Sequence, residues 1–227
     1  MLLPRSDCVL SFAGLTADAY PLMLQAYNAI EHFPKLKSGA MDICSLKGHL
    51  LRVFNFQRSF IGNLPHGQCA PDEPAAIFLL SGYSWREKRF RVWTLHYDAN
   101  IQKFTFRPSM PWRGQANSEQ KIIGFVGDDE AVKEAKIRLV DLLRLKQKLQ
   151  SGGLDMEPFE ILRDIIRSNM FPSVGGPPQL AKIYESQTRH PFEVYWPTKA
   201  SGKISFMGRP LMPFEKASGK ITDPDNP

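Results

Sequence analysis

Apolar residues first cluster at 8–14, a short and nearly unbroken run that ends in glycine and predicts a buried strand. Behind it, apolar residues recur three or four positions apart, which predicts an amphipathic helix over 17–33. Thr16 and Asp18 are residue types that cap helices, and Pro34 ends the pattern. The apolar stripe of this helix is formed by Leu22, Ala26, Ile30 and Phe33.

A second amphipathic helix is predicted over 42–56, with Asp42 as its capping residue. Its apolar stripe is formed by Ile43, Leu46, Leu50 and Val53. Glycine and proline residues then mark 62–74 as a loop. Four strand-like runs follow, at 76–81, 89–97, 103–107 and 121–126. Short turns separate the second run from the first and from the third, so an antiparallel meander is the simplest pairing.

The last part of the chain again begins with two helices, predicted over 129–150 and 157–170, the first of them capped by Asp128. Three further strand candidates lie at 180–185, 192–196 and 204–207. The end of the chain is rich in Lys, Asp, Gly and Pro, which predicts a disordered tail. The expected organisation is therefore one folded domain over 1–213 and a disordered tail over 214–227.

Helices thus occur in adjacent pairs between groups of strands and do not alternate singly with them. This order excludes a doubly wound parallel sheet and favours an α+β fold, in which helix pairs cover largely antiparallel sheets. We expect helices 17–33 and 42–56 to pack together on one sheet, and helices 129–150 and 157–170 on the other.

The composition is that of a globular protein: 43% of the 227 residues are apolar and 23% are charged. No apolar run approaches the roughly 18 to 20 residues of a membrane helix. Charged residues also come too early in the chain for a signal peptide, and three cysteines are too few for a disulfide scaffold. We therefore expect a cytoplasmic protein without membrane contact.

The net charge is +6, from 29 basic and 23 acidic residues, which makes a nucleic-acid partner conceivable. The basic cluster between Arg86 and Arg91 is interrupted by Glu87, however, and the basic residues of 133–148 alternate with acidic ones. This distribution is typical of solvated surfaces, so nucleic-acid binding is disfavoured. A basic module built on the Arg86–Arg91 cluster stays open as a weaker alternative.

Signals for metals and cofactors are weak. His66 and Cys69 have a spacing that could hold a metal ion, but Cys44 and His49 do not form a second spaced pair. Neither of the glycine-rich phosphate-binding motifs occurs. Cys8 lies in an apolar run, where a small buried residue is expected rather than a nucleophile. We expect no metal and no cofactor.

Three segments, in this order, resemble the proteasome-type N-terminal-nucleophile (Ntn) hydrolases. Residues Ser11–Ala19 are similar to the family's strand that ends in Ala-Gly before an Asp-containing helix start, and Ala76–Tyr83 to the strand that opens its central meander. Residues Ile122–Gly127 lead into the long helix, and Ser173–Gly176 resemble the family's Gly-Gly loop before the last strands. The resemblance extends over residues 1–210 and is greater to divergent bacterial relatives than to standard proteasome subunits.

The resemblance implies a four-layer αββα sandwich, with two antiparallel sheets between helix pairs. Gly14 matches the glycine whose backbone N–H helps to form the oxyanion hole, and Phe12 and Thr16 match residues lining the pocket for the residue before the scissile bond. Considered without the resemblance, the same residues are a strand-ending glycine, a core phenylalanine and a helix-capping threonine. Asp128 stands where the family tends to have a supporting serine, and Ser173 is next to the position of another.

Family members use an N-terminal Thr, Ser or Cys as nucleophile, activated by its own α-amino group. This chain starts near the family's third to fourth strand, so the nucleophile and its Asp and Lys have no counterpart. We expect the chain to be N-terminally incomplete, with a start codon upstream, and to be inactive as it stands.

Two functions follow. The first is a proteasome-related hydrolase of peptide or amide bonds whose nucleophile is absent from this chain. The second is a non-catalytic structural or interaction subunit on the same scaffold. The resemblance also implies a homo-oligomer and peptide substrates.

Overall fold

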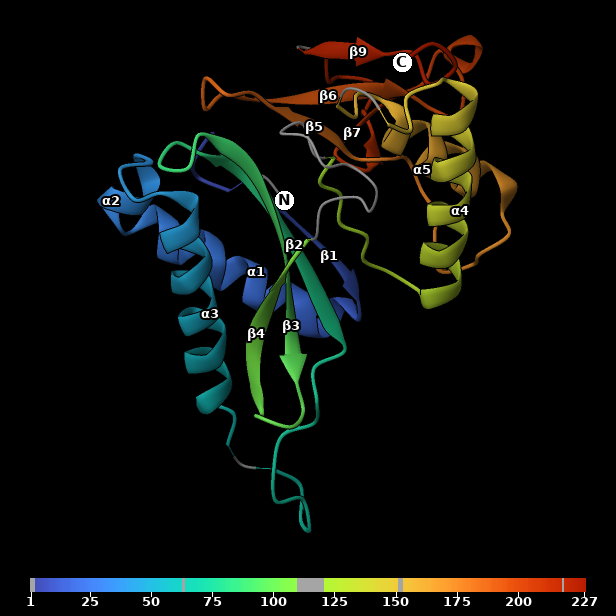
Figure 1. Cartoon of the computed structure of the whole chain (residues 1–227). Helices are drawn as coiled ribbons and strands as arrows, with labels where there is room; N and C mark the ends of the chain where they lie inside the picture. The colour runs from blue at the N-terminus through green and yellow to red at the C-terminus, as the bar shows by residue number, and fades with distance from the viewer. Residues whose placement is uncertain (1–2, 63, 110–120, 151–152, 218) are drawn as a thin grey trace. The chain divides into compact units, whose positions relative to one another are not determined.

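A computed structural model of the chain describes residues 3–62, 64–109, 121–150, 153–217 and 219–227 (Figure 1). The described residues form two compact units. The first unit consists of those within Met1–Met110, Ile122–Gly127 and Ile183–Thr188, and the second of the remainder. The sequence predicted one domain over 1–213, and the structure divides that stretch between both units.

The first unit is a four-stranded antiparallel sheet with helices packed on one face (Figure 1). Its elements are β1 (Cys8–Gly14), α1 (Thr16–Glu31), α2 (Pro34–Lys37), α3 (Ile43–Ser59), β2 (Ala76–Ser84), β3 (Arg89–Asp98) and β4 (Lys103–Pro108). The strands lie in the order β1-β2-β3-β4, so β2–β4 form the predicted meander and β1 extends it. Helices α1 and α3 contact each other and this sheet, which confirms the expected first helix pair.

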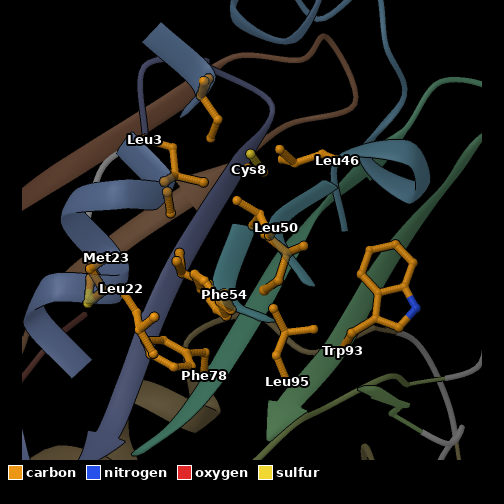
Figure 2. Packing of buried hydrophobic residues seen from close by; sticks show 14 of the residues in the cluster. Leu3, Cys8, Leu22, Met23, Leu46, Leu50, Phe54, Phe78, Trp93 and Leu95 are labelled. Atoms are coloured by element: carbon orange, nitrogen blue, oxygen red, sulfur yellow. The ribbon is translucent and has the colours of Figure 1, made fainter. Parts of the chain in front are cut away.

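The core of this unit lies between the two long helices and the sheet (Figure 2). Phe54 of α3 contacts the rings of Phe78 and Phe104, with centroid distances of 4.9 and 5.5 Å. Leu80 of β2 pairs with Leu10 on one side and Trp93 on the other, so alternate residues of three strands reach the same face. Fully burying each such side chain stabilises the fold by about 1.5–3 kcal/mol.

The second unit contains the second helix pair and most of a second, mixed sheet. Its elements are α4 (Asp129–Leu145), α5 (Glu157–Ser168), β5 (Leu180–Ile183), β6 (Arg189–Tyr195), β7 (Ile204–Phe206), β8 (Arg209–Pro210) and β9 (Lys220–Thr222), with a short 3₁₀ turn at Lys199–Ser201. Helices α4 and α5 contact each other. The strands β6, β7 and β8 are antiparallel neighbours, and β9 is parallel to β6.

Two expectations from the sequence are corrected here. The tail over 214–227 was predicted to be disordered, yet Lys220–Thr222 form β9 and pair with Phe192–Val194 of β6. The apolar run at 121–126 was predicted to be a fourth strand, yet only an isolated bridge lies there. Gly124 lies against the side chains of Leu79 and Val92 on the sheet. The apolar residues of this run are half-buried, and Gly124 lies on the sheet without a strand ladder around it.

A third correction concerns Pro34. It was predicted to end the first helix, but α1 ends at Glu31 and Pro34 begins the short helix α2. Proline is compatible with the first turn of a helix because the N–H it lacks has no partner there. Pro34 therefore marks the start of α2 and not the end of α1.

Candidate functional site

Gly14 lies where β1 turns into α1, with a φ of +103°. A Cβ atom at this position would lie 2.1 Å from the carbonyl oxygen of Ala75. Leu15 donates its N–H to that oxygen at 2.7 Å, and the Asp18 carboxylate accepts the Ala75 N–H at 2.8 Å. The chain's own backbone thus requires glycine here, whether or not a substrate binds. The oxyanion role of Gly14 stays a prediction.

Phe12 and Thr16 lie near Gly14 in the chain but in different surroundings. Phe12 is half-buried, packs against the core and pairs with Phe78 across the sheet. Thr16 is exposed in the first turn of α1, and the N-cap is Leu15, which makes no side-chain cap bond. The expected capping role of Thr16 is therefore wrong. A pocket-lining role for Phe12 and Thr16 stays a prediction.

In the second unit, the structure brings together two residues that the resemblance singled out. Asp128 is the N-cap of α4, but its side chain makes no cap bond and instead accepts a hydrogen bond from the Ser173 hydroxyl at 2.6 Å. Both residues are exposed. This hydrogen bond fixes the orientation of the Ser173 hydroxyl.

The Asp42 carboxylate, in the first unit, is fully buried and accepts hydrogen bonds from separate parts of the chain. One carboxylate oxygen caps α3 by accepting the Cys44 N–H at 2.8 Å, as the sequence predicted. The other accepts the Ser84 hydroxyl at 2.9 Å and the Arg86 N–H at 3.2 Å. Burial opposes ionisation, but the Cys44 and Arg86 donors outweigh it and lower the pKa of Asp42. The carboxylate thereby fastens the β2–β3 turn to the start of α3.

The thiol of Cys44 belongs to the same network. It donates to a Glu87 carboxylate oxygen at 3.3 Å. Burial and the neighbouring carboxylates of Asp42 and Glu87 raise its pKa to about 11. Because the reactive form of a thiol is the thiolate, a raised pKa suppresses its chemistry at neutral pH. Cys8 is buried, as expected, and Cys69 is exposed.

A hollow of about 610 Å³ lies at the end of the β3–β4 hairpin and was not predicted from the sequence. It is lined by His96, Tyr97, Asp98, Ala99, Asn100, Thr105, Phe106 and Arg107. Burial, and then the charge of Arg107, lower the pKa of His96, whose Nε2 accepts the Arg107 Nε–H at 3.2 Å. The residue opposite His96 across the β3–β4 ladder is Thr105.

The structure gives no group of three metal-ligating side chains among the residues it describes. His66 and Cys69 both lie in the exposed loop that precedes β2. In the described part of the chain, the helices are too short or too polar to cross a membrane.

Comparison with known proteins leaves the family open. No protein-family model matches the sequence, and no curated protein matches it. The candidate sites therefore depend on their own geometry and on the resemblance of the quoted segments.

Proposed function

We propose that this chain is an Ntn-hydrolase-like protein related to the proteasome, arranged as a four-layer αββα sandwich, in which these 227 residues supply the scaffold and do not cleave peptides. The observation that carries the proposal is that Gly14 and the Cys44 thiol, which could have taken part in catalysis, both make structural contacts instead. Gly14 is packed against Ala75, and the Cys44 thiol is protonated beside Glu87. The pairing of α1 with α3 on an antiparallel sheet supports the scaffold part of the proposal.

A second candidate is a non-catalytic interaction subunit on the same scaffold. Exposed apolar side chains on the helices favour it. On α4, Ile137 and Leu145 are both exposed, Leu145 by 82%. Tyr20, Leu24 and Tyr27 form a further exposed row on α1. Such apolar surface is characteristic of proteins that associate, and we propose a homo-oligomer.

The two candidates agree on activity, which gives the test. The purified chain should not hydrolyse a panel of fluorogenic peptides and simple amides above the buffer blank. The variants Ser173→Ala and Cys69→Ser remove the exposed hydroxyl and the exposed thiol considered above. Turnover by the parent chain that either substitution abolishes would contradict the proposal, because the nucleophile would then lie within these residues.

A further inference from the structure

The corner formed by the β2–β3 turn and helix α2 combines an exposed indole with positive charge. Its members are Lys35, Trp85, Arg86 and Lys88, which we call the Trp85 corner. Trp85 is 39% exposed, and the Arg86 guanidinium lies 5.8 Å from its ring centroid. In Figure 1, α2 and the β2–β3 turn lie beside each other, in agreement with the hydrogen bond between the Trp85 indole N–H and the Gly39 carbonyl at 3.2 Å.

The Trp85 corner is held in place by hydrogen bonds from the backbone of its turn to two buried side chains. The buried Asp42 carboxylate accepts the Arg86 N–H, and the Ser84 hydroxyl accepts the Glu87 N–H at 3.1 Å. The turn is therefore fixed by its backbone, and the side chains of Arg86 and Lys88 are not needed to hold it. A surface that is ordered before binding loses little conformational entropy on binding.

The charges of this region do not cancel. Glu87 pairs with Arg89 and Arg91, each at 2.7 Å, and these contacts lower the pKa of Glu87 to about 2. Glu31 pairs with Lys37. Among the described residues, Lys35, Arg86 and Lys88 make no ion pair, and the Arg86 guanidinium lies over the indole.

We propose that the Trp85 corner binds an acidic segment of another protein, in which Asp or Glu residues flank one apolar side chain. The carboxylates would meet Lys35, Arg86 and Lys88, and the apolar side chain would pack on the exposed part of Trp85. This inference rests on the proposed role of the chain as a scaffold and names the class of its partner.

The geometry favours an acidic peptide over a nucleic acid. Non-specific affinity for nucleic acid depends on the number of phosphates neutralised, and only three free cations are present in the described part of this corner. The Trp85 N–H already donates to the Gly39 carbonyl, and the Arg86 guanidinium lies over the ring, 5.8 Å from its centroid. A stacked base needs an open ring face, whereas an aliphatic or aromatic side chain can pack on an edge.

The test uses the full chain and a short fluorescein-labelled peptide rich in Asp and Glu with one central Phe, followed by fluorescence anisotropy at low and at physiological ionic strength. An Asn/Gln version of the peptide and an oligothymidine of equal charge are the comparison probes. The charge-reversal variant Arg86→Glu with Lys88→Glu should weaken acidic-peptide binding at least about tenfold. Lys133→Glu with Lys203→Glu makes the same change of charge at exposed positions elsewhere and should have little effect.

Trp85→Ala should weaken binding of the Phe-containing peptide more than binding of its Phe→Ala version. The proposal is overturned if the acidic peptide does not bind at low salt, if both charge-reversal variants weaken binding equally, or if the oligothymidine binds more tightly than the peptide. Loss of peptide binding without peptide cleavage would remove only this inference. Cleavage of the peptides would instead contradict the proposed function.

Discussion

At the scale of single residues, the contact of Gly14 with Ala75 gives a direct prediction. Gly14→Ala places a Cβ atom 2.1 Å from a carbonyl oxygen at a φ of +103°, so both the backbone and its neighbour must shift. We expect the free energy of unfolding to fall by about 2–4 kcal/mol, measured by urea denaturation.

Gly48 provides the control. It lies inside α3, and a Cβ atom there would meet nothing within 4 Å. Gly48→Ala should therefore leave stability unchanged or raise it by up to about 1 kcal/mol. Equal stability of Gly14→Ala and the parent chain would show that the turn is free to rearrange, and the structural explanation of Gly14 would fail.

Asp42 gives a prediction with a pH dependence. Its pKa is lowered in the folded state, so its ionised form adds stability that is complete above the ordinary carboxyl pKa and is lost as the pH falls through the lower, folded-state value. Asp42→Asn should lower the free energy of unfolding by about 1–3 kcal/mol near neutral pH. Denaturation as a function of pH should show this difference shrinking below about pH 4. A difference independent of pH would contradict the assignment.

The three cysteines should differ in reactivity because their exposure and their surroundings differ. Cys69 is exposed, whereas the pKa of Cys44 is raised to about 11 and Cys8 is buried. Iodoacetamide at pH 8 should therefore modify Cys69 first, and mass spectrometry of the digested protein should find Cys44 unmodified at early times. In the variant Cys69→Ser, the fast phase of modification by iodoacetamide should disappear. Early modification of Cys44 would show that its hydrogen bond to Glu87 does not protect the thiol.

The sequence predicted the capping role of Asp42 because an aspartate directly before an amphipathic stripe is a local signal. It could not predict the partners Ser84 and Arg86, which lie more than 40 residues further along the chain. The hollow at His96 lies on a hairpin that the sequence did predict, but the pattern of apolar and polar residues does not show that its lining residues leave a space between them. The sequence thus revealed local roles, and the structure added their long-range partners.

At the scale of elements, the periodic segments were predicted best. The strand at 8–14 coincides with β1, and the predicted helix over 42–56 is α3 (Ile43–Ser59). The failures were segments whose state is decided by distant contacts. The run at 121–126 is apolar but packs on a sheet at Gly124 without forming a strand. Strand β9 has little apolar character and forms through its pairing with β6.

The terminal strand β9 gives the prediction at this scale. Deleting 214–227 removes its pairing with β6 and the contact of Arg167 with Asp225 at 2.6 Å. Losing about 1–2 kcal/mol in this way should lower the melting temperature by several degrees, measured by circular dichroism. Hydrogen exchange should become faster at Phe192–Val194 in the shortened chain. Lys216→Ala, a change at an exposed position outside β9, is the control. An unchanged melting temperature would support the disordered tail that the sequence predicted.

At the scale of the whole molecule, the exposed apolar residues are the feature that a monomer does not explain. Tyr20, Leu24 and Tyr27 repeat at helical spacing along α1, so they form one row on its outer side and contribute little to the core. If this row mediates self-association, Leu24→Lys with Tyr27→Lys should shift the protein to monomers without lowering its stability. Light scattering at micromolar concentrations measures this shift. Ala99→Lys with Ala200→Lys adds the same charge at exposed positions outside α1 and should leave the oligomer intact. A parent chain that is monomeric throughout this range would remove the homo-oligomer from the proposal, and the row on α1 would then need a different protein as its partner.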